Sequence, residues 1–545
     1  MRFVGAVCMV GTPRVIVLAG PGVCYAHVCW SGAMRVKKHA VRGNEPRTLA
    51  WGLLALVLFA LCYIHQSRYT FATAFSRLAL LETVVSHGRL EIDRYRAKTS
   101  DTALVNGHHY SDKAPGTAAL ALPAFAAAAR VLEAQDRSVD SEIGWLVASW
   151  VTCAFSQALP AALGAVALFM SLSRVVRFRP ALLSVLALTL GCLALPYSTL
   201  LFSHAQVIGL IGMTIWAIGL WGETAEDVRA RRAEARRGRG ENGSPKAEDE
   251  GQRARQEGEG TVAKIGRWRM ALAGFCLGLA LASEYTAGLV VVALAVYVVW
   301  KRRAGLWAFV LAAVAPLLLI PAYSWAVIGN PFELPYSYQA NFEEMREGLY
   351  AIKWPDLENL GRLVFGPTRG LVFWTPFLIM AGFGWWSLAR ERPGHLWLTY
   401  ALPVVHALVI SGRTWDWQAG FTISARYMAP ILPLLALPCA IGTQRWPKMG
   451  GVLAILSITM MTVATITDAC PDYSMYNPLT ELHMPKVIRG EFSHTLGTDV
   501  FGLHPWVSVG LYYAVLICGV KWLWRLAGRA DKESSTEPLT RADCR

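Results

Sequence analysis

The amino-acid sequence predicts an all-α integral membrane protein with about twelve transmembrane helices. The 545 residues are 54% hydrophobic and only 17% charged, whereas a soluble domain is closer to a quarter charged. Apolar runs long enough to cross a hydrocarbon core of about 30 Å recur along the chain. The lysines and arginines, which give a formal net charge of +14, lie in short strings between those runs, as in membrane proteins that use them for orientation.

The predicted spans are apolar runs of suitable length, and the basic strings beside them set their direction. They cover residues 49–66, 143–172, 181–199, 204–221, 270–285, 286–300, 304–328, 370–389, 395–412, 427–444, 449–468 and 506–526.

A further apolar run, 116–132, is rich in alanine. If it crossed the membrane, every basic string from Arg174 onward would face the outer side. We therefore expect 116–132 to be a re-entrant or interfacial helix. The resulting prediction is a multi-pass protein of the cell (inner or plasma) membrane with both termini in the cytoplasm.

The predicted spans and their orientation divide the chain into five segments. Residues 1–48 form an amino-terminal extension that is partly disordered, with a secretory signal and a true start at Met34 as alternatives. Residues 49–221 form a membrane module with a long outer loop at 67–142. The segment 222–268 alternates charged and small residues without apolar period, which predicts a disordered cytoplasmic insert. A second module, 269–526, carries outer loops at 329–369, 413–426 and 469–505, and a cytoplasmic tail at 527–545 follows.

Composition excludes several function classes. The 11 cysteines include no CxxC pair, which argues against a zinc site or a redox motif. The basic residues serve orientation, so we expect no nucleic-acid partner. The spans hold few ionisable residues, Glu284 being the main exception, which favours chemistry at the outer surface over a transmembrane pathway.

The stretch from residue 99 to 116 contains the densest group of reactive side chains in the chain. It packs Asp101, His108, His109, Tyr110 and Lys113 directly before the helix predicted at 116–132. A lysine beside a helix amino terminus is a suitable phosphate site, because the free N–H groups and the dipole attract anions. The alternative is a lysine that extends towards the interface.

The order of several motifs resembles the GT-C superfamily of polytopic glycosyltransferases, and most closely the protein mannosyltransferase and aminoarabinose transferase-like group. The resemblance runs from about residue 49 onward. Its motifs are Gly88-Arg-Leu-Glu-Ile-Asp93, Tyr110-Ser-Asp-Lys-Ala-Pro-Gly116, Phe202-Ser-His204, Gly366-Pro-Thr-Arg-Gly-Leu371 and Gly420-Phe-Thr-Ile-Ser-Ala-Arg-Tyr-Met-Ala-Pro430. One departure is clear: where better-known branches carry an acidic residue after the first helix, this chain reads His65-Gln-Ser-Arg-Tyr69.

The resemblance implies an enzyme that takes a sugar from a polyprenyl-phosphate carrier in the bilayer and passes it, with inversion, to an acceptor on the extracytoplasmic side. An outer-loop carboxylate would act as the base; Asp101 is the first candidate, Asp93 the second and Glu82 the third. A solvated carboxylate is the alternative for each. Because His65-Gln-Ser-Arg-Tyr69 lacks a carboxylate, a relative without catalytic activity is a further alternative.

Basic residues would hold the carrier phosphate. Lys113, Arg426 and Arg369 are the candidates, the two arginines standing where outer loops enter helices. Side chains expected to line the substrate site are His108, His109, Tyr110, His204, Trp415, Asp416 and Trp417. The interfacial aromatic belt is an equally good explanation of the two tryptophans. His204 can hydrogen-bond a substrate or bind a metal ion. We expect no required cofactor, and a divalent metal ion is the alternative.

A transporter or flippase for a lipid-linked or amphipathic solute is the competing function. It would require internal inverted repeats and ionisable groups at midplane depth, and the sequence contains no convincing repeat. Neither the sugar nor the acceptor, whether protein, lipid or glycan, follows from the sequence.

Overall fold

The structure, a computed structural model, describes residues 45–66, 72–221, 266–303, 305–346, 352–413 and 416–536. The predictions for 1–44, for most of the insert at 222–268, for Trp415 and for residues 537–545 lie outside these ranges. The statements below concern the described residues.

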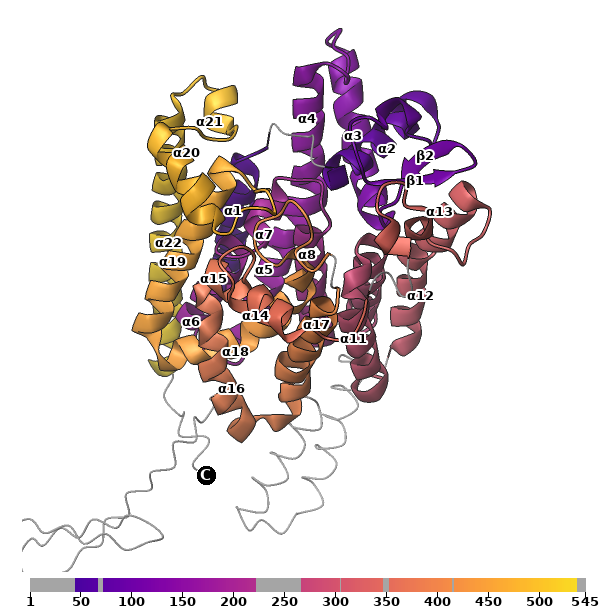
Figure 1. The fold of residues 1–545 in the computed structure, drawn as a ribbon. Coiled ribbons are helices and arrows are strands. Elements are labelled where there is room, and N and C mark those ends of the chain that lie inside the picture. The colour runs from indigo at the N-terminus through magenta and orange to yellow at the C-terminus, as the bar shows by residue number, and fades with distance from the viewer. Residues whose placement is uncertain are drawn as a thin grey trace, which may run out of the picture. The chain divides into compact units, whose positions relative to one another are not determined.

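The described chain is helical almost throughout (Figure 1). In chain order, the helices and strands are α1 (Glu45–Tyr63), α2 (Ala72–His87), β1 (Thr102–Val105), β2 (His108–Ser111), α3 (Gly116–Glu133), α4 (Glu142–Cys153), α5 (Leu159–Leu172), α6 (Phe178–Leu190), α7 (Ala194–Ser198), α8 (His204–Ile218), a helix over 266–283, α11 (Gly288–Lys301), α12 (Leu306–Leu317), α13 (Leu319–Ile328), α14 (Leu357–Phe365), α15 (Leu371–Trp374), α16 (Ile379–Glu391), α17 (Leu402–Ser411), α18 (Leu432–Arg445), α19 (Pro447–Thr467), α20 (Met484–Arg489), α21 (Leu496–Asp499) and α22 (Pro505–Thr536).

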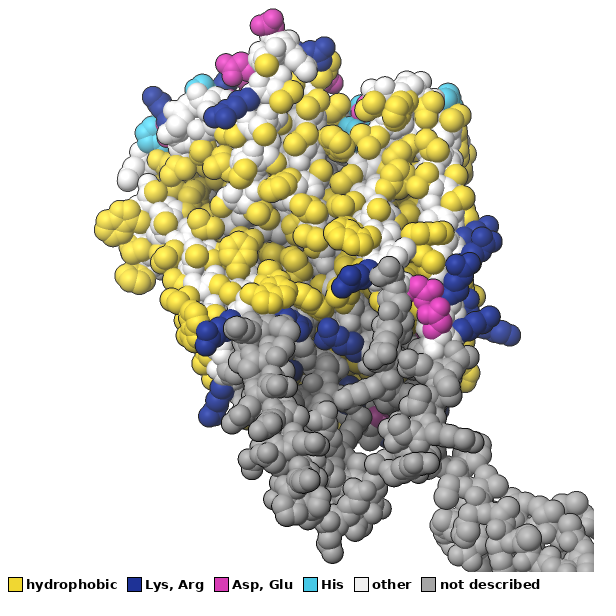
Figure 2. All heavy atoms as spheres, turned by 180° about the vertical axis from the view of Figure 1, so that it is seen from behind, with side chains coloured by type: hydrophobic (Ala, Val, Ile, Leu, Met, Phe, Trp, Pro, Cys, Tyr) yellow, Lys and Arg dark blue, Asp and Glu magenta, His cyan; other side chains and the backbone are white. Residues whose placement is uncertain are grey.

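The helices confirm an α-helical, multi-pass membrane protein. Among the described residues, eight helical runs are long and apolar enough to cross a bilayer. They are Glu45–Tyr63, Gly116–Glu133, Glu142–Leu172, Leu306–Ile328, Pro393–Ser411, Arg426–Arg445, Pro447–Thr467 and Pro505–Glu533, and shorter apolar helices cover Phe178–Leu190, His204–Ile218 and Tyr285–Lys301. The number of twelve spans stays a prediction. Figure 2 shows apolar side chains as a broad band across the face that it draws, with lysines and arginines along the lower edge of this band.

Small residues allow the central helices to pack at short range. A Cβ atom on Gly164 of α5 would lie 2.4 Å from the Cα atom of Gly209 in α8. Lipid tails provide no hydrophobic drive for helix association, so such close backbone contact is a main source of stability in membrane bundles. The pair α5 and α8 therefore forms a rigid base for the loop residues that precede α8.

The predicted outer loop at 67–142 contains more regular structure than the sequence suggested. It holds α2, a two-stranded antiparallel sheet of β1 and β2, and α3. Asn106 and Gly107 connect the strands with φ angles of 52° and 85°, as in a two-residue type I′ turn. These elements lie together with the end of α13 at the upper right of Figure 1; this end of the bundle is called the hairpin end below.

The helix predicted at 116–132 is present as α3, and it packs against α2 and α4. Its first residue, Gly116, lies against the backbone of Ala282. Length and composition alone would allow α3 to cross a membrane. The interfacial or re-entrant placement therefore stays a prediction.

The last helix continues beyond its predicted end at residue 526. It reaches Thr536, and the Asp531 carboxylate accepts hydrogen bonds from the backbone N–H groups of Phe178 (2.7 Å) and Arg179 (3.3 Å). The first part of the predicted tail is therefore packed against the start of α6.

Candidate functional site

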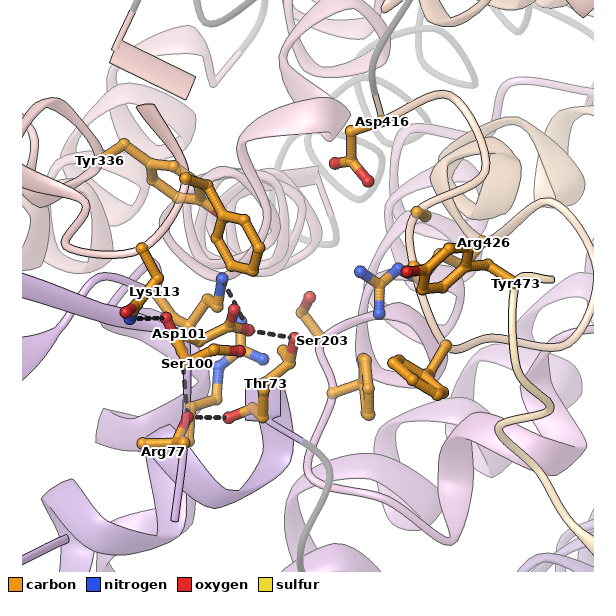
Figure 3. Close-up of a pocket in the computed structure, with 18 of the residues that line it drawn as sticks. Thr73, Arg77, Ser100, Asp101, Lys113, Ser203, Tyr336, Asp416, Arg426 and Tyr473 are labelled. Atoms are coloured by element: carbon orange, nitrogen blue, oxygen red, sulfur yellow. Dashed lines mark hydrogen bonds and ion pairs between the residues drawn. The ribbon is translucent and has the colours of Figure 1, made fainter. Parts of the chain in front are cut away.

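A cavity of about 910 Å³ lies at the hairpin end (Figure 3). Parts of the chain that are far apart in sequence form its walls. These are residues 72–77, residues 96–101 with Lys113, residues 202–204 with Glu284, residues 336–342, and residues 416–427 with Tyr473. Figure 3 shows two facing groups: Thr73, Arg77, Asp101 and Lys113 on one side, and Asp416, Arg426 and Tyr473 on the other.

The first wall is built around Lys113. Its ammonium group lies 2.9 Å from Oδ2 of Asp101 and 3.0 Å from Oδ2 of Asp112. Thr73 donates a hydrogen bond of 2.6 Å to Oδ2 of Asp101, and Gln339 donates one of 3.0 Å to Oδ2 of Asp112. Three ionisable groups are thus held in fixed positions with little exposure to water.

Burial and mutual contact shift the pKa values of these groups. Burial raises the pKa of Asp112 to about 6, and the charge of Asp101 adds to this rise, while Lys113 opposes it. For Asp101, burial also acts upward, but Lys113 and Thr73 outweigh it and lower the pKa. Burial acts to lower the pKa of Lys113, yet the two carboxylates raise it well above its usual value. Asp101 is therefore ionised at neutral pH, and Asp112 is the group that takes up a proton first.

Arg77 adds a second buried cation to this wall. It is 3% exposed, and its Nη1 donates a hydrogen bond of 3.3 Å to the Leu201 carbonyl. Its charge acts on Glu284, Asp112 and Asp101 without direct contact. The formal charges of Lys113 and Arg77 together offset those of Asp101 and Asp112.

Arg426 is the principal charge of the opposite wall. Its guanidinium lies 5.0 Å from the ring centre of Phe202 and 5.4 Å from that of Tyr427. Within the described part of the chain, no carboxylate lies within 4.0 Å of it. The neighbouring Asp416 is already engaged, because Arg413 contacts its Oδ2 at 3.1 Å and the Tyr427 hydroxyl donates to the same atom at 2.6 Å.

A strained loop carries Arg426 to this position. Ala419, Gly420 and Ser424 all have positive φ angles, of 62°, 64° and 55°, and for the two residues with side chains this conformation is unfavourable. The surrounding contacts must therefore stabilise the loop.

Five of the predicted site residues line the cavity: Asp101, Lys113, His204, Asp416 and Arg426. The structure places Asp93, His108, His109, Tyr110, Arg369 and Trp417 elsewhere, and Trp415 is outside the described residues. None of these placements tests a catalytic or binding role.

Asp93 holds the β1–β2 hairpin. Its carboxylate accepts a hydrogen bond of 2.6 Å from the His109 backbone N–H and contacts Nδ1 of His108 at 2.7 Å. Glu82 is buried, with His87 and Arg94 each 3.8 Å away, so the alternative of a solvated carboxylate does not hold for it. Neither carboxylate lines the cavity.

Arg369 is fully buried and bonds to backbone carbonyls. It donates to Gly420 (3.2 Å), Pro471 (3.3 Å) and Thr368 (3.2 Å). These contacts join the strained loop that carries Arg426 to the segment that carries Tyr473. The geometry gives Arg369 a positioning role for the second wall.

Most residues that line the cavity were not among the predicted site residues; Arg77, Ser203, Tyr336 and Tyr427 are examples. Arg77 and Tyr336 stand outside the motifs of the sequence, whereas Ser203 and Tyr427 lie within two of them. Ser203 and Tyr427 flank the predicted His204 and Arg426, so their neighbours were the available signal.

A second cavity, of about 210 Å³, adjoins the first. The two share Arg77, Glu284, Tyr336 and Tyr427, and the apolar side chains of the second include Leu289, Val409 and Ile410. Among the described residues, no three His, Cys, Asp or Glu side chains are arranged to hold a metal ion.

Fold and site together define a multi-pass α-helical membrane protein with a charged cavity at one end of its helical bundle. No protein-family model matches the chain, and no curated protein matches it.

Among solved structures, the chain is similar to ArnT from Cupriavidus metallidurans bound to undecaprenyl phosphate, with a TM-score of 0.40 and 16% identity over 92% of this chain and 80% of that chain. The same protein in its apo state gives a TM-score of 0.39 with 16% identity, over 91% and 78%. AglB from Archaeoglobus fulgidus, an archaeal oligosaccharyltransferase in complex with an inhibitory peptide and a dolichol-phosphate, gives 0.38 with 11% identity, over 90% and 56%. TM-scores of 0.40 and below leave the assignment of function to the residues of this chain.

Proposed function

We propose that this protein is a membrane glycosyltransferase that moves a sugar from a polyprenyl-phosphate donor to an acceptor on the extracytoplasmic side, with inversion at the anomeric carbon. One observation carries the proposal. An ionised, buried carboxylate, Asp101, faces an arginine without a carboxylate partner, Arg426, across a cavity of about 910 Å³. A volume of this size accommodates a sugar phosphate.

Arg426 is suited to the departing phosphate. A guanidinium binds phosphate oxygens through two parallel hydrogen bonds, and this one is not neutralised by a carboxylate of the described chain. The aromatic rings of Phe202 and Tyr427 shield the guanidinium of Arg426 from water. This shielding strengthens its interaction with an anion. Arg426 therefore stabilises the charge that develops as the carrier phosphate leaves.

Asp101 is suited to the acceptor hydroxyl. Its contacts with Thr73 and Lys113 both involve Oδ2, so Oδ1 is available to a substrate. The acceptor oxygen attacks the anomeric carbon while Asp101 takes its proton. The bond between that carbon and the phosphate oxygen breaks, and the carrier leaves as a phosphate anion. Attack from the face opposite the phosphate gives inversion.

Lys113 holds Asp101 in place and keeps it ionised. This role is additional to any contact that Lys113 makes with the carrier phosphate. Its charge lowers the pKa of Asp101, and its contact fixes the carboxylate. Because Asp112 also engages the ammonium group at 3.0 Å, Arg426 is the stronger of the two cations for an incoming anion.

A transfer assay tests the proposal. Purified protein in detergent, given undecaprenyl phosphate bearing a radiolabelled sugar and a membrane extract, should move label to an acceptor. Asp101→Asn should reduce the rate by about 100-fold or more, the usual weight of a general base, and Lys113→Ala and Arg426→Ala should also lose transfer. Asp136→Asn and Arg137→Ala, exposed changes away from the cavity, are the matched controls.

Full transfer in both Asp101→Asn and Lys113→Ala would show that the assigned site is wrong. The competing function, a transporter or flippase, predicts a different result. Label would then cross the bilayer of reconstituted vesicles while staying bonded to its original carrier.

A further inference from the structure

Glu284 lies between the helix over 266–283 and the short helix η3 (Tyr285–Ala287). Its carboxylate lines both the large cavity and the smaller apolar one. Ser203 donates a hydrogen bond to Oε2, and Thr286 donates one of 3.0 Å to Oε1. Each carboxylate oxygen is thereby fixed by one hydroxyl group, while a carboxylate has room for about four hydrogen bonds.

Glu284 differs from the other carboxylates of this region in its lack of a cation in direct contact. Asp101 and Asp112 share Lys113, and Asp416 contacts Arg413. Among the described residues, no lysine or arginine lies within 4.0 Å of Glu284. His204 lies at that distance, and its Nδ1 is 3.8 Å away and has no hydrogen-bond partner among the described residues.

A carboxylate that is 14% exposed and has no paired cation costs free energy unless other donors complete its hydrogen bonds. Ser203 and Thr286 provide two donors, and Glu284 lines the cavity. Water, or the hydroxyl groups of a bound molecule that displaces it, can supply the rest. The carrier phosphate is unsuitable because two anions repel, whereas a sugar ring offers several hydroxyl donors.

We propose that Glu284 is a specificity-determining residue that accepts hydrogen bonds from hydroxyl groups of the transferred sugar. The inference rests on the proposed function and deepens it. Arg426 binds the phosphate, Asp101 faces the reacting carbon, and Glu284 binds the ring away from that carbon. A sugar that lacks a hydroxyl at the contacted position would leave the carboxylate with only its Ser203 and Thr286 donors. A site built to hydrogen-bond a substrate hydroxyl discriminates strongly against an analogue that lacks it.

The test separates binding of the sugar from binding of the carrier. Dissociation constants are measured for the purified full-length protein with bare undecaprenyl phosphate and with undecaprenyl phosphate bearing glucose, mannose or arabinose. In the wild type, at least one sugar-bearing carrier should bind more tightly than the bare carrier. Glu284→Gln should reduce this sugar-dependent gain in affinity by about tenfold, the usual contribution of a hydrogen bond to a charged group.

The controls distinguish specificity from folding. Glu284→Gln should bind bare undecaprenyl phosphate as the wild type does, Thr286→Val should lose a smaller part of the sugar-dependent gain, and Glu343→Gln, an exposed change outside the cavity, should lose none.

Three results would overturn the inference. Glu284→Gln could keep the whole sugar-dependent gain in affinity, or it could weaken binding of the bare carrier as much as binding of the sugar-bearing carrier. In the third case, no sugar would add affinity in the wild type. In these cases carrier binding itself still stands. If the wild type binds none of the four lipids, the proposed function fails as well.

Discussion

The ammonium group of Lys113 contacts Asp101 at 2.9 Å and Asp112 at 3.0 Å. An anionic ligand that approaches it meets a group of three charges whose sum is negative. Uptake of a proton by Asp112 removes that excess. Burial raises the pKa of Asp112 to about 6, so the change in charge falls between pH 5 and 7.

This arrangement predicts a pH dependence of carrier binding. As the pH falls from 7 to 5, Asp112 becomes neutral, Lys113 has one carboxylate partner fewer, and affinity for undecaprenyl phosphate glucose should increase severalfold. This ligand is a phosphodiester and keeps its charge over that range. Isothermal titration at several pH values measures the effect.

Asp112→Asn is the matched variant. It should bind as tightly at pH 7 as the wild type binds at pH 5, and its affinity should not vary with pH. A wild-type affinity that is constant from pH 5 to 7 would contradict the assigned protonation.

At the level of residues, the sequence indicated one half of the cavity better than the other. Asp101 and Lys113 stand in one loop, twelve positions apart, and the motif around Arg426 marked a loop-to-helix entry. Arg77 and Glu284 come from elements distant in sequence. Only the folded chain brings them to the same cavity, and a single sequence carries no signal for that proximity.

The loop from 416 to 426 determines where Arg426 lies. Its strained residues are held by Arg369 through the carbonyls of Gly420 and Pro471, and by Tyr197, which donates to the Ile423 carbonyl at 3.2 Å. Arg369 therefore acts on the site through the backbone.

Replacement of Arg369 should impair the site without removing a ligand contact. Arg369→Ala leaves buried carbonyls without donors, and we expect a loss of about 2–4 kcal/mol in the free energy of unfolding, together with weaker carrier binding. Arg369→Lys should recover little, because one ammonium group cannot reach carbonyls on both sides as a planar guanidinium does. Unfolding curves and carrier affinity measure both effects; unchanged affinity in Arg369→Ala would contradict the positioning role.

The β1–β2 hairpin determines where Asp101 and Lys113 lie, since they precede and follow it. Gly107 has a φ angle of 85°, which strains any residue with a side chain by about 1–3 kcal/mol. Gly107→Val should lower the melting temperature and reduce transfer. Asn106→Gly should leave both unchanged, because glycine adopts the same turn conformation. Equal melting temperatures for Gly107→Val and the wild type would argue against the turn.

At the level of elements, long apolar helices were predictable because their length and hydropathy are local properties. The hairpin was missed, although Val105-Asn-Gly-His108 contains the dipeptide typical of a type I′ turn. Its strands are four residues each and polar at one end. They gain a further partner from a distant segment, where the Ala340 backbone N–H donates to Thr102 at 2.8 Å.

For the whole molecule, the account requires the hairpin end to face the extracytoplasmic side. His108 is exposed on that end. After the native cysteines are blocked, His108→Cys should react with a membrane-impermeant maleimide added outside intact cells, and Lys301→Cys should react only after permeabilisation. The reverse pattern would remove the enzyme proposal, because a lipid-linked sugar on the outer side would not reach the cavity.

At this scale, basic strings and apolar runs predicted a multi-pass helical protein, since both follow from the energetics of a bilayer. They did not predict that the wall with Asp101 and Lys113 would face the wall with Arg426 across a cavity. That arrangement depends on packing between the first outer segment and loops more than 300 residues later.

A structure determined by electron cryomicroscopy with undecaprenyl phosphate tests the central claim most directly. The account predicts the phosphate in the large cavity, within hydrogen-bonding distance of the Arg426 guanidinium and facing Asp101. A phosphate bound away from Arg426, or a cavity that stays free of lipid at saturating carrier, would contradict it.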